Sequence, residues 1–209
     1  MKTKTKALAL ALCAVLLVVT TVFVTMAYLT STTDVVKNTF TYGQVTITLD
    51  EAEVDEYGKE IIGADRVTEN SYKLIPGHKY TKDPTVHIDK ASEDCYVFVR
   101  VVDEISGIEK DTTVAQQMQT NGWMSLSGVD NVWYYNNKVT SETEDTATRG
   151  TTDGVDLLVF GTFTIKDDAN VSAYFGKLIT VQAYAVQADG FDSAADAWDA
   201  APTEWTEKM

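Results

Sequence analysis

The feature that most limits the fold of this chain is a set of segments whose side chains alternate or cluster as β-strands require. Residues 39–49 are predicted to form a strand, because Val45, Ile47 and Leu49 fall on one face of an extended chain and Thr46 and Thr48 fall on the other. Residues 178–186 have the same period of two, which is typical of a half-buried strand. Residues 96–102 are nearly all β-branched or aromatic, which indicates a strand covered on both faces.

Shorter segments between turn-forming residues extend this prediction. Two helices are expected, at residues 112–120 and at residues 193–201, the second with Ser193 as its N-cap. Many strands, frequent turns and few helices together favour an all-β protein built as an antiparallel β-sandwich with short helical insertions. The remaining strands are predicted at residues 84–89, 123–126, 132–135 and 155–165.

The N-terminus has the three parts of a secretory signal. Three lysines within the first six residues are followed by an uncharged stretch, rich in Leu and Val, that reaches Ala27. Thr25 and Ala27 place small side chains at the positions that a signal peptidase reads. We therefore predict a helical signal peptide at residues 1–27, with cleavage between Ala27 and Tyr28. The alternative is an uncleaved membrane anchor, because the apolar stretch is about long enough to span a bilayer, which takes ~20 residues.

Cleavage would leave a polar, flexible segment at residues 28–38 and one domain at residues 39–209. Within the domain, a loop rich in Thr and acidic residues is predicted near residues 138–154. Cys95 would be the only remaining thiol, because Cys13 lies in the signal. No intrachain disulfide is then expected, and burial of the core must stabilise the domain.

The charge of the chain narrows the choice of partners. The formal net charge is −14, and removal of three lysines with the signal would bring it to −17. Such a surface repels nucleic acids and anionic membranes, and it favours divalent cations or basic partners. We therefore expect no nucleic-acid partner, and membrane contact only through an uncleaved signal.

Residues that could support catalysis are few. The chain has two histidines, His78 in a Pro-Gly-His turn and His87 in a predicted strand, and no HExxH motif. Together with an acidic residue, these two histidines could bind zinc. The favoured interpretation is that one histidine lies at the surface and the other lies in a strand with a backbone partner. Cys95 follows two acidic residues and is predicted to be an unreactive thiol at the edge of the core. We assign no catalytic residue and no cofactor.

Two further patterns leave binding open. Acidic clusters at residues 51–56, 142–145 and 167–168 lack the spacing of a calcium loop, so solvated loops are favoured over weak calcium sites. A group of aromatic side chains could stack on sugars, although packing in the core is the favoured interpretation. This aromatic group consists of Trp123, Trp133, Tyr134 and Tyr135.

Several short motifs follow one another in a characteristic order. An Ala-Tyr pair at the predicted cleavage point leads into a link rich in Thr and Ser, and an N-x-F-x-x-G sequence follows at residues 38–43. Residues 74–82 form an L-x-P-G turn that ends in Thr-Lys, with His78 where Asp is more usual, and residues 180–187 form a last strand that ends in A-x-Q. In this order, the motifs resemble the TasA/camelysin family of secreted proteins from Gram-positive bacteria.

The resemblance implies a jelly-roll-like β-sandwich that is released by a SipW-type signal peptidase. It also implies a place in the extracellular matrix or at the cell surface, because family members that form biofilm fibres donate their freed N-terminal segment to the next subunit. The candidate donor residues in this sequence are Val35, Val36 and Phe40. The camelysin branch is described as metallopeptidases, but this sequence lacks a recognisable set of zinc ligands, so that activity is not carried over.

The leading hypothesis is a non-enzymatic structural protein that assembles with itself or with other matrix proteins. The first alternative is a secreted camelysin-like metallopeptidase that uses His78 and His87. The second alternative is a surface module that binds a glycan or calcium.

Overall fold

The computed structural model describes residues 12, 13, 15, 16, 44–147, 154–202 and 205. The chain divides into two compact units, Met1–Thr41 and Tyr42–Met209. In the first unit, the four described residues are helical and exposed. The rest of the predicted signal, its cleavage point at Ala27 and Tyr28, and the candidate donors Val35, Val36 and Phe40 lie outside the described residues.

No helix among the described residues has the length and apolar character needed to cross a bilayer.

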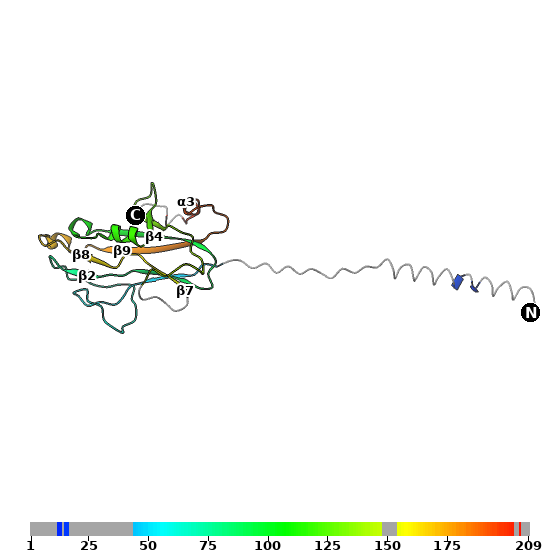
Figure 1. The fold of residues 1–209 in the computed structure, drawn as a ribbon, viewed down its shortest axis with the longest axis horizontal. Helices are drawn as coiled ribbons and strands as arrows, with labels where there is room; N and C mark the ends of the chain where they lie inside the picture. Colours follow the sequence, from blue (N-terminus) through cyan, green and yellow to red (C-terminus); the bar gives the residue numbers. More distant parts are fainter. Residues whose placement is uncertain (1–11, 14, 17–43, 148–153, 203–204, 206–209) are drawn as a thin grey trace, which may run out of the picture. The chain divides into compact units, whose positions relative to one another are not determined.

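The second unit is built mainly of antiparallel strands, which lie in two layers (Figure 1). The first sheet has the order β1-β3-β7 and consists of β1 (Ile47–Asp50), β3 (Thr85–Asp89) and β7 (Gly154–Leu158). The second sheet has the order β5-β6-β4-β9 and consists of β5 (Trp123–Ser125), β6 (Val132–Tyr135), β4 (Cys95–Asp103) and β9 (Ile179–Gln187). A separate pair consists of β2 (Lys79–Thr81) and β8 (Thr162–Thr164).

Short helices connect these strands. The α-helix α2 (Val114–Thr120) lies where the sequence predicts it and begins with a capping box between Thr113 and Gln116. The second predicted helix is α3 (Ala194–Trp198), which is capped by Ser193 and ends three residues earlier than expected. The described residues also contain the 3₁₀ turns η1 (Ser106–Ile108) and η2 (Val171–Tyr174).

The two sheets share one hydrophobic core. Because successive side chains of a strand point to opposite faces, alternate residues of β4 reach inward and meet those of β3 and β7. These inward residues are Val97, Val99 and Val101 on β4, Val86 and Ile88 on β3, and Val155 and Leu157 on β7. The outer face of β4 is covered as well, since the ring of Phe98 lies 5.2 Å from that of Trp198 on α3. This confirms the prediction of a strand covered on both faces.

The prediction of one strand at residues 155–165 is wrong, because this segment forms β7 and β8 with a break between them. At the break, the side-chain oxygen of Gln117 on α2 accepts hydrogen bonds from the backbone amides of Gly161 and Thr162. The chain then leaves the first sheet, and β8 pairs with β2, with Phe163 opposite Tyr80. Gly161 lies in this break, and a glycine inside a strand pattern is typical of an interruption, which the side chain of Gln117 here holds in place.

The shared core gives the first prediction. Leu157 is fully buried between the sheets, so Leu157→Ala should lower the free energy of unfolding by about 2–5 kcal/mol through lost burial and a cavity. Ile62→Ala serves as the control, because Ile62 is 89% exposed and should change stability by less than about 0.5 kcal/mol. Urea unfolding followed by tryptophan fluorescence measures both. Equal effects of the two variants would contradict this description of the core.

Candidate functional site

The site with the most unusual structure lies along one side of the second unit, between the edge strands β1 and β9, which contact each other across the core. Two adjoining hollows open there. The first, which we call the aromatic hollow, has a volume of about 580 Å³. The second, which we call the acidic hollow, has a volume of about 540 Å³. The hollows share Asn70, Lys82, Leu178 and Ile179, so they form one continuous groove, which we call the seam.

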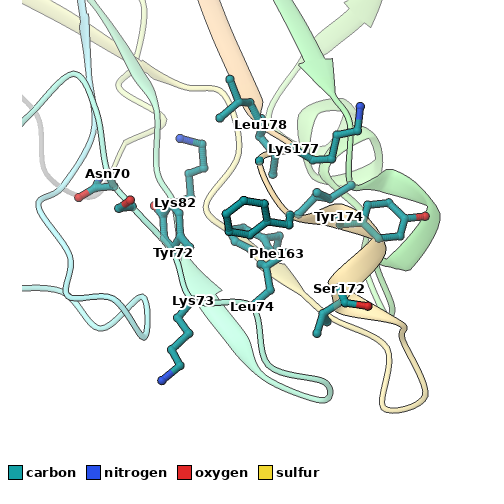
Figure 2. Close-up of a pocket in the computed structure, with 16 residues that line it drawn as sticks. Asn70, Tyr72, Lys73, Leu74, Lys82, Phe163, Ser172, Tyr174, Lys177 and Leu178 are labelled. Atoms are coloured by element: carbon teal, nitrogen blue, oxygen red, sulfur yellow. The ribbon is translucent and has the colours of Figure 1, made fainter.

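Aromatic and aliphatic side chains form the walls of the aromatic hollow (Figure 2). The rings of Tyr72 and Phe163 meet edge to face at 5.3 Å, and the ring of Phe163 stacks on that of Tyr80 at 4.8 Å. At the mouth, Phe175 is 95% exposed and Leu178 is 59% exposed. The hollow therefore presents apolar surface to solvent.

The strand β9 forms one wall of the seam and has an unsatisfied edge. Its nine residues pair with β4, from Ile179 opposite Asp103 to Gln187 opposite Cys95. Within the described part of the chain, no backbone hydrogen bond joins its other edge to a neighbour. Such an edge can accept a further strand.

Burial along the seam is incomplete. On β4, the inward-facing valines are fully or almost fully buried. The inward-facing residues of β9 pack against the same core but are only half-buried, and so are Ile47 and Leu49 on β1. The four residues of β9 concerned are Ile179, Val181, Ala183 and Ala185. The core thus lacks cover along this one side.

Charges are divided between the two hollows. The charged residues that line the aromatic hollow are Lys73, Lys82 and Lys177, with no acidic residue among them. The acidic hollow is lined by three carboxylates, on Asp50, Glu51 and Glu69, and shares Lys82. In a chain with 31 acidic and 17 basic residues, a hollow whose charged lining residues are all lysines is unexpected. The seam therefore has a basic end and an acidic end.

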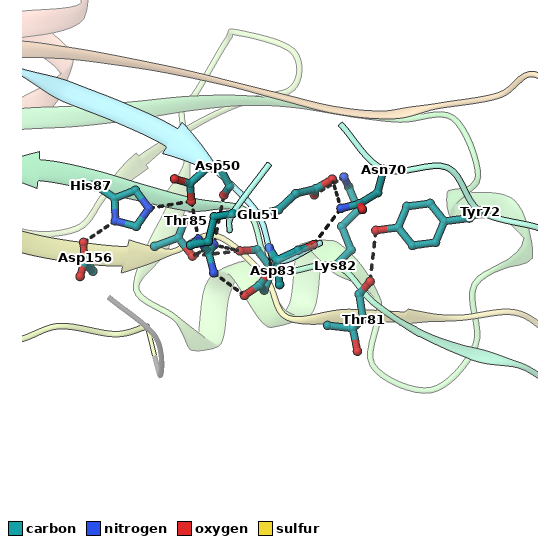
Figure 3. A network of polar contacts seen from close by, with 12 residues as sticks. Asp50, Glu51, Asn70, Tyr72, Thr81, Lys82, Asp83, Thr85, His87 and Asp156 are labelled. Carbon is teal, nitrogen blue, oxygen red and sulfur yellow. Dashed lines mark hydrogen bonds and ion pairs between the residues drawn. The ribbon is translucent and has the colours of Figure 1, made fainter. Parts of the chain in front are cut away.

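Ion pairs hold the lysines in place. The Nζ atom of Lys82 lies 2.5 Å from a carboxylate oxygen of Glu51, and the amide of Asn70 donates to the other oxygen of Glu51 at 2.9 Å (Figure 3). The Nζ atom of Lys177 lies 2.8 Å from Glu104. Both pairs fix side chains at the seam, and they offset the charges of Lys82 and Lys177, so Lys73 is the lysine of the aromatic hollow that has neither of these partners.

A network of charged residues braces the β1 side of the seam. Arg66 donates to the carboxylates of Asp50 and Asp83, and these contacts raise its pKa against the opposing effect of burial, which is the largest single influence. On β3, Nδ1 of His87 lies 2.5 Å from Asp156 of β7, and Nε2 lies 2.8 Å from Asp50 of β1 (Figure 3). His87 thus ties together all three strands of the first sheet.

The structure does not join the two histidines in one site. Nε2 of His78 lies 2.8 Å from the backbone oxygen of Tyr57, whereas both ring nitrogens of His87 face carboxylates. The sequence-based expectation of a backbone partner for His87 is therefore wrong. Both ring nitrogens of His87 are thus already engaged by carboxylates of neighbouring strands. Among the described residues, no group of three or more His, Cys, Asp or Glu side chains is arranged to hold a metal ion.

The other residues singled out from the sequence, Cys95 and the aromatic group, lie in the hydrophobic clusters or pack against them. Cys95 is fully buried, so its predicted place in the core is confirmed, and burial, with a smaller contribution from Asp94, raises the pKa of its thiol to about 12. The aromatic group divides between the two faces of its sheet: Trp123, Trp133 and Tyr135 pack against the shared core, and Tyr134 packs on the outer face.

Sequence analysis missed Glu109, a buried carboxyl between η1 and α2. One of its oxygens accepts a hydrogen bond from the amide of Val114 at 3.1 Å, and the other has no hydrogen-bond partner in the described part of the chain. Burial, followed by the nearby charge of Asp103, raises the pKa of Glu109 to about 7. Nothing in the local sequence distinguishes this residue from a loop glutamate.

No protein-family model, curated protein or solved structure matches this chain. The seam, its charges and its incomplete burial are therefore the observations from which function must be inferred.

The buried carboxyl of Glu109 should make stability depend on pH. Because the folded state raises its pKa from 4.5 to about 7, folding favours the protonated form, and the free energy of unfolding should fall as pH rises between these values. Glu109→Gln removes the charge and should stabilise the protein by about 2–3 kcal/mol at pH 8, with little effect at pH 4. Denaturant unfolding at both pH values measures this, with Glu144→Gln on an exposed loop as the control. A gain that is equal at pH 4 and pH 8 would refute the assignment.

The two histidines should differ in their effect on stability. His87→Ala removes a group that binds two carboxylates, one of them fully buried, and should lower the free energy of unfolding at pH 6 by about 3 kcal/mol. His78→Ala removes one bond at the surface and should cost about 1 kcal/mol or less. Thermal unfolding of both variants provides the comparison. Comparable losses would show that the network around His87 does not brace the sheet.

Proposed function

We propose that this protein is a secreted structural subunit of the extracellular matrix or cell surface. In this proposal, a jelly-roll-like domain assembles into fibres by strand donation between copies. The single observation that carries the proposal is the seam. There the nine-residue edge strand β9 faces the edge strand β1, and the inward side chains of both strands remain half-buried.

An added strand would pair with the free backbone edge of β9 and would also cover the half-buried side chains along the seam. Its backbone would pair with the outer edge of β9, as in complexes that form by addition of a strand to a sheet. Its apolar side chains would cover the half-buried residues of β9 and β1, with a gain of about 25 cal/mol for each Å² of apolar surface removed from water. Because such a contact joins two different surfaces of the subunit, it need not close, and an open series of contacts gives a filament.

The proposed donor is the segment that signal cleavage would release, residues 28–38 with the strand that follows. Val35, Val36 and Phe40 are its candidate apolar contacts. Support comes from the signal-like N-terminus and from the motifs that resemble the TasA/camelysin family. A SipW-type signal peptidase acting between Ala27 and Tyr28 would free this segment. The strongly acidic surface suits a protein that stays soluble until a specific contact forms.

Deletion of the donor tests the proposal. The mature chain, residues 28–209, should form filaments that sediment and are visible by negative-stain electron microscopy, and deletion of residues 28–38 should abolish them. A mature chain that stays strictly monomeric over a range of pH and salt would refute the proposal.

A variant of the acceptor gives a sharper test. Ala183→Trp places a large side chain among the half-buried inward residues of β9 and should block assembly, whereas Ile62→Trp, at an exposed site outside both hollows, should not. The chain that lacks residues 28–38 keeps its acceptor, and the Ala183→Trp chain keeps its donor. Mixed together, these two inactive chains should form a one-to-one dimer by analytical ultracentrifugation. Circular dichroism of each variant confirms that it is folded.

A further inference from the structure

We propose that Lys82 and Asn70 join in an intramolecular isopeptide bond, with Glu51 between them as the carrier of protons. The bond links Nζ of Lys82 to Cγ of Asn70 and releases one molecule of ammonia. Its basis is a contact geometry: the nitrogens of the two side chains bind the two oxygens of one buried carboxylate (Figure 3). The bond is a modification of the subunit itself and is independent of the proposed function.

The fold brings these three side chains together from separate segments. Glu51 belongs to the segment that follows β1 and exchanges two backbone hydrogen bonds with Val67, each of 2.8 Å. This pairing brings Asn70, three residues further along, to the side of Glu51. Lys82 follows β2, and its amide donates to the backbone oxygen of Gly161 at 3.1 Å. The reacting groups therefore meet within one folded chain, and such proximity strongly accelerates a reaction between two groups.

Lys82 can reach its neutral, nucleophilic form by handing one proton to Glu51. Nζ lies 2.5 Å from Oε2 of Glu51, so a proton that moves along this hydrogen bond turns the ion pair into an amine and a carboxylic acid. The pair is shielded from water, since the side chains of Lys82 and Glu51 are only 11% and 6% exposed. Tyr72, whose ring centroid lies 5.9 Å from Nζ, shares these surroundings. Burial, followed by the charges of Glu51 and Asp83, raises the pKa of Tyr72.

The amide of Asn70 is held in position for attack. Its Oδ1 accepts a hydrogen bond from the backbone amide of Val54 at 3.0 Å, which polarises the carbonyl group. Its Nδ2 donates to Oε1 of Glu51 and to the backbone oxygen of Ala52, both at 2.9 Å. Hydrogen bonds to a carbonyl lie close to its plane. These contacts therefore fix the orientation of the amide and leave the faces of Cγ for a nucleophile.

The reaction balances within these groups. Oε2 of Glu51 takes a proton from Nζ of Lys82, and the neutral amine attacks Cγ of Asn70 to form the new carbon–nitrogen bond. The amide of Val54 stabilises the negative oxygen of the tetrahedral intermediate. Glu51 then gives its proton to Nδ2 and takes a second one from Nζ. The bond between Cγ and Nδ2 breaks, ammonia leaves, and Glu51 ends as a carboxylic acid, with no change in oxidation state.

The bond closes a loop that spans residues 70–82. Three residues of this loop, Tyr72, Lys73 and Leu74, line the aromatic hollow, so the bond ties one wall of the seam to the segment that follows β2. Both cysteines of the chain are free, so no disulfide closes a loop. A covalent link of this kind restricts the unfolded chain and thereby favours the folded state.

Mass spectrometry of the mature chain, residues 28–209, tests the inference. After denaturation, the intact mass should lie below the sequence mass by one ammonia, about 17 Da. Trypsin should release residues 67–73 and residues 80–90 as one branched peptide, because a bonded Lys82 is no longer a cleavage site. A chain that keeps its full sequence mass after prolonged incubation in the folded state would overturn the inference.

Variants locate the bond and its proton carrier. Lys82→Arg and Asn70→Ala each remove a reacting group and should keep their full sequence mass. Glu51→Gln retains a side chain that forms hydrogen bonds but cannot carry protons, so the bonded fraction should fall to roughly a tenth or less. Lys79→Arg and Glu56→Gln, at exposed positions of neighbouring segments, are the matched controls and should lose ammonia as the unchanged chain does. Circular dichroism checks that each variant is folded.

Two further outcomes are decisive. Asn70 can also lose ammonia by closing on the backbone at Ser71, a reaction that does not involve Lys82. Loss of ammonia that persists in Lys82→Arg would therefore overturn the bond, and full bonding in Glu51→Gln would overturn the role of Glu51. A mature chain that carries the bond but forms no filaments would refute the proposed function and leave this inference standing.

Discussion

The uncovered edge of β9 is the constraint on which this account depends. A strand inside a sheet has two neighbours, but among the described residues β9 has one, and its inward side chains remain half-buried. Edge strands in soluble proteins are usually short, charged, or covered, because exposed backbone groups invite pairing with another chain. Here the edge is nine residues long and borders two hollows, so the surface is suited to accept a strand.

The first sheet holds the other wall of this groove firm. His87 joins β3 to β1 through Asp50 and to β7 through Asp156, and Arg66 joins Asp50 to Asp83. Buried charged groups contribute little net stability when they are well paired, but they strongly disfavour arrangements in which a partner is lost. The network therefore fixes the position of β1, and with it the width of the seam.

Much of the fold follows from local sequence, because strand periodicity and helix caps are local signals. The strands at residues 96–102 and 178–186, and the helix cap at Ser193, lie close to where the sequence predicts them. Contacts between distant residues account for the rest. Gln117 binds the break between β7 and β8, two aspartates from other strands surround His87, and burial together with the charge of Asp103 sets the pKa of Glu109 apart. The seam was equally hidden, since it arises from two edge strands more than a hundred residues apart in the sequence.

Amide hydrogen exchange of β9 tests the central claim most directly. The mature chain, measured under assembly conditions by mass spectrometry, should show strong new protection in peptides that cover Ile179–Gln187, relative to the same peptides from the chain without residues 28–38. Peptides from β4, which is already paired on both sides, should change little. Filaments that form without any gain of protection in β9 would contradict the account, because their subunits would be joined at some other surface.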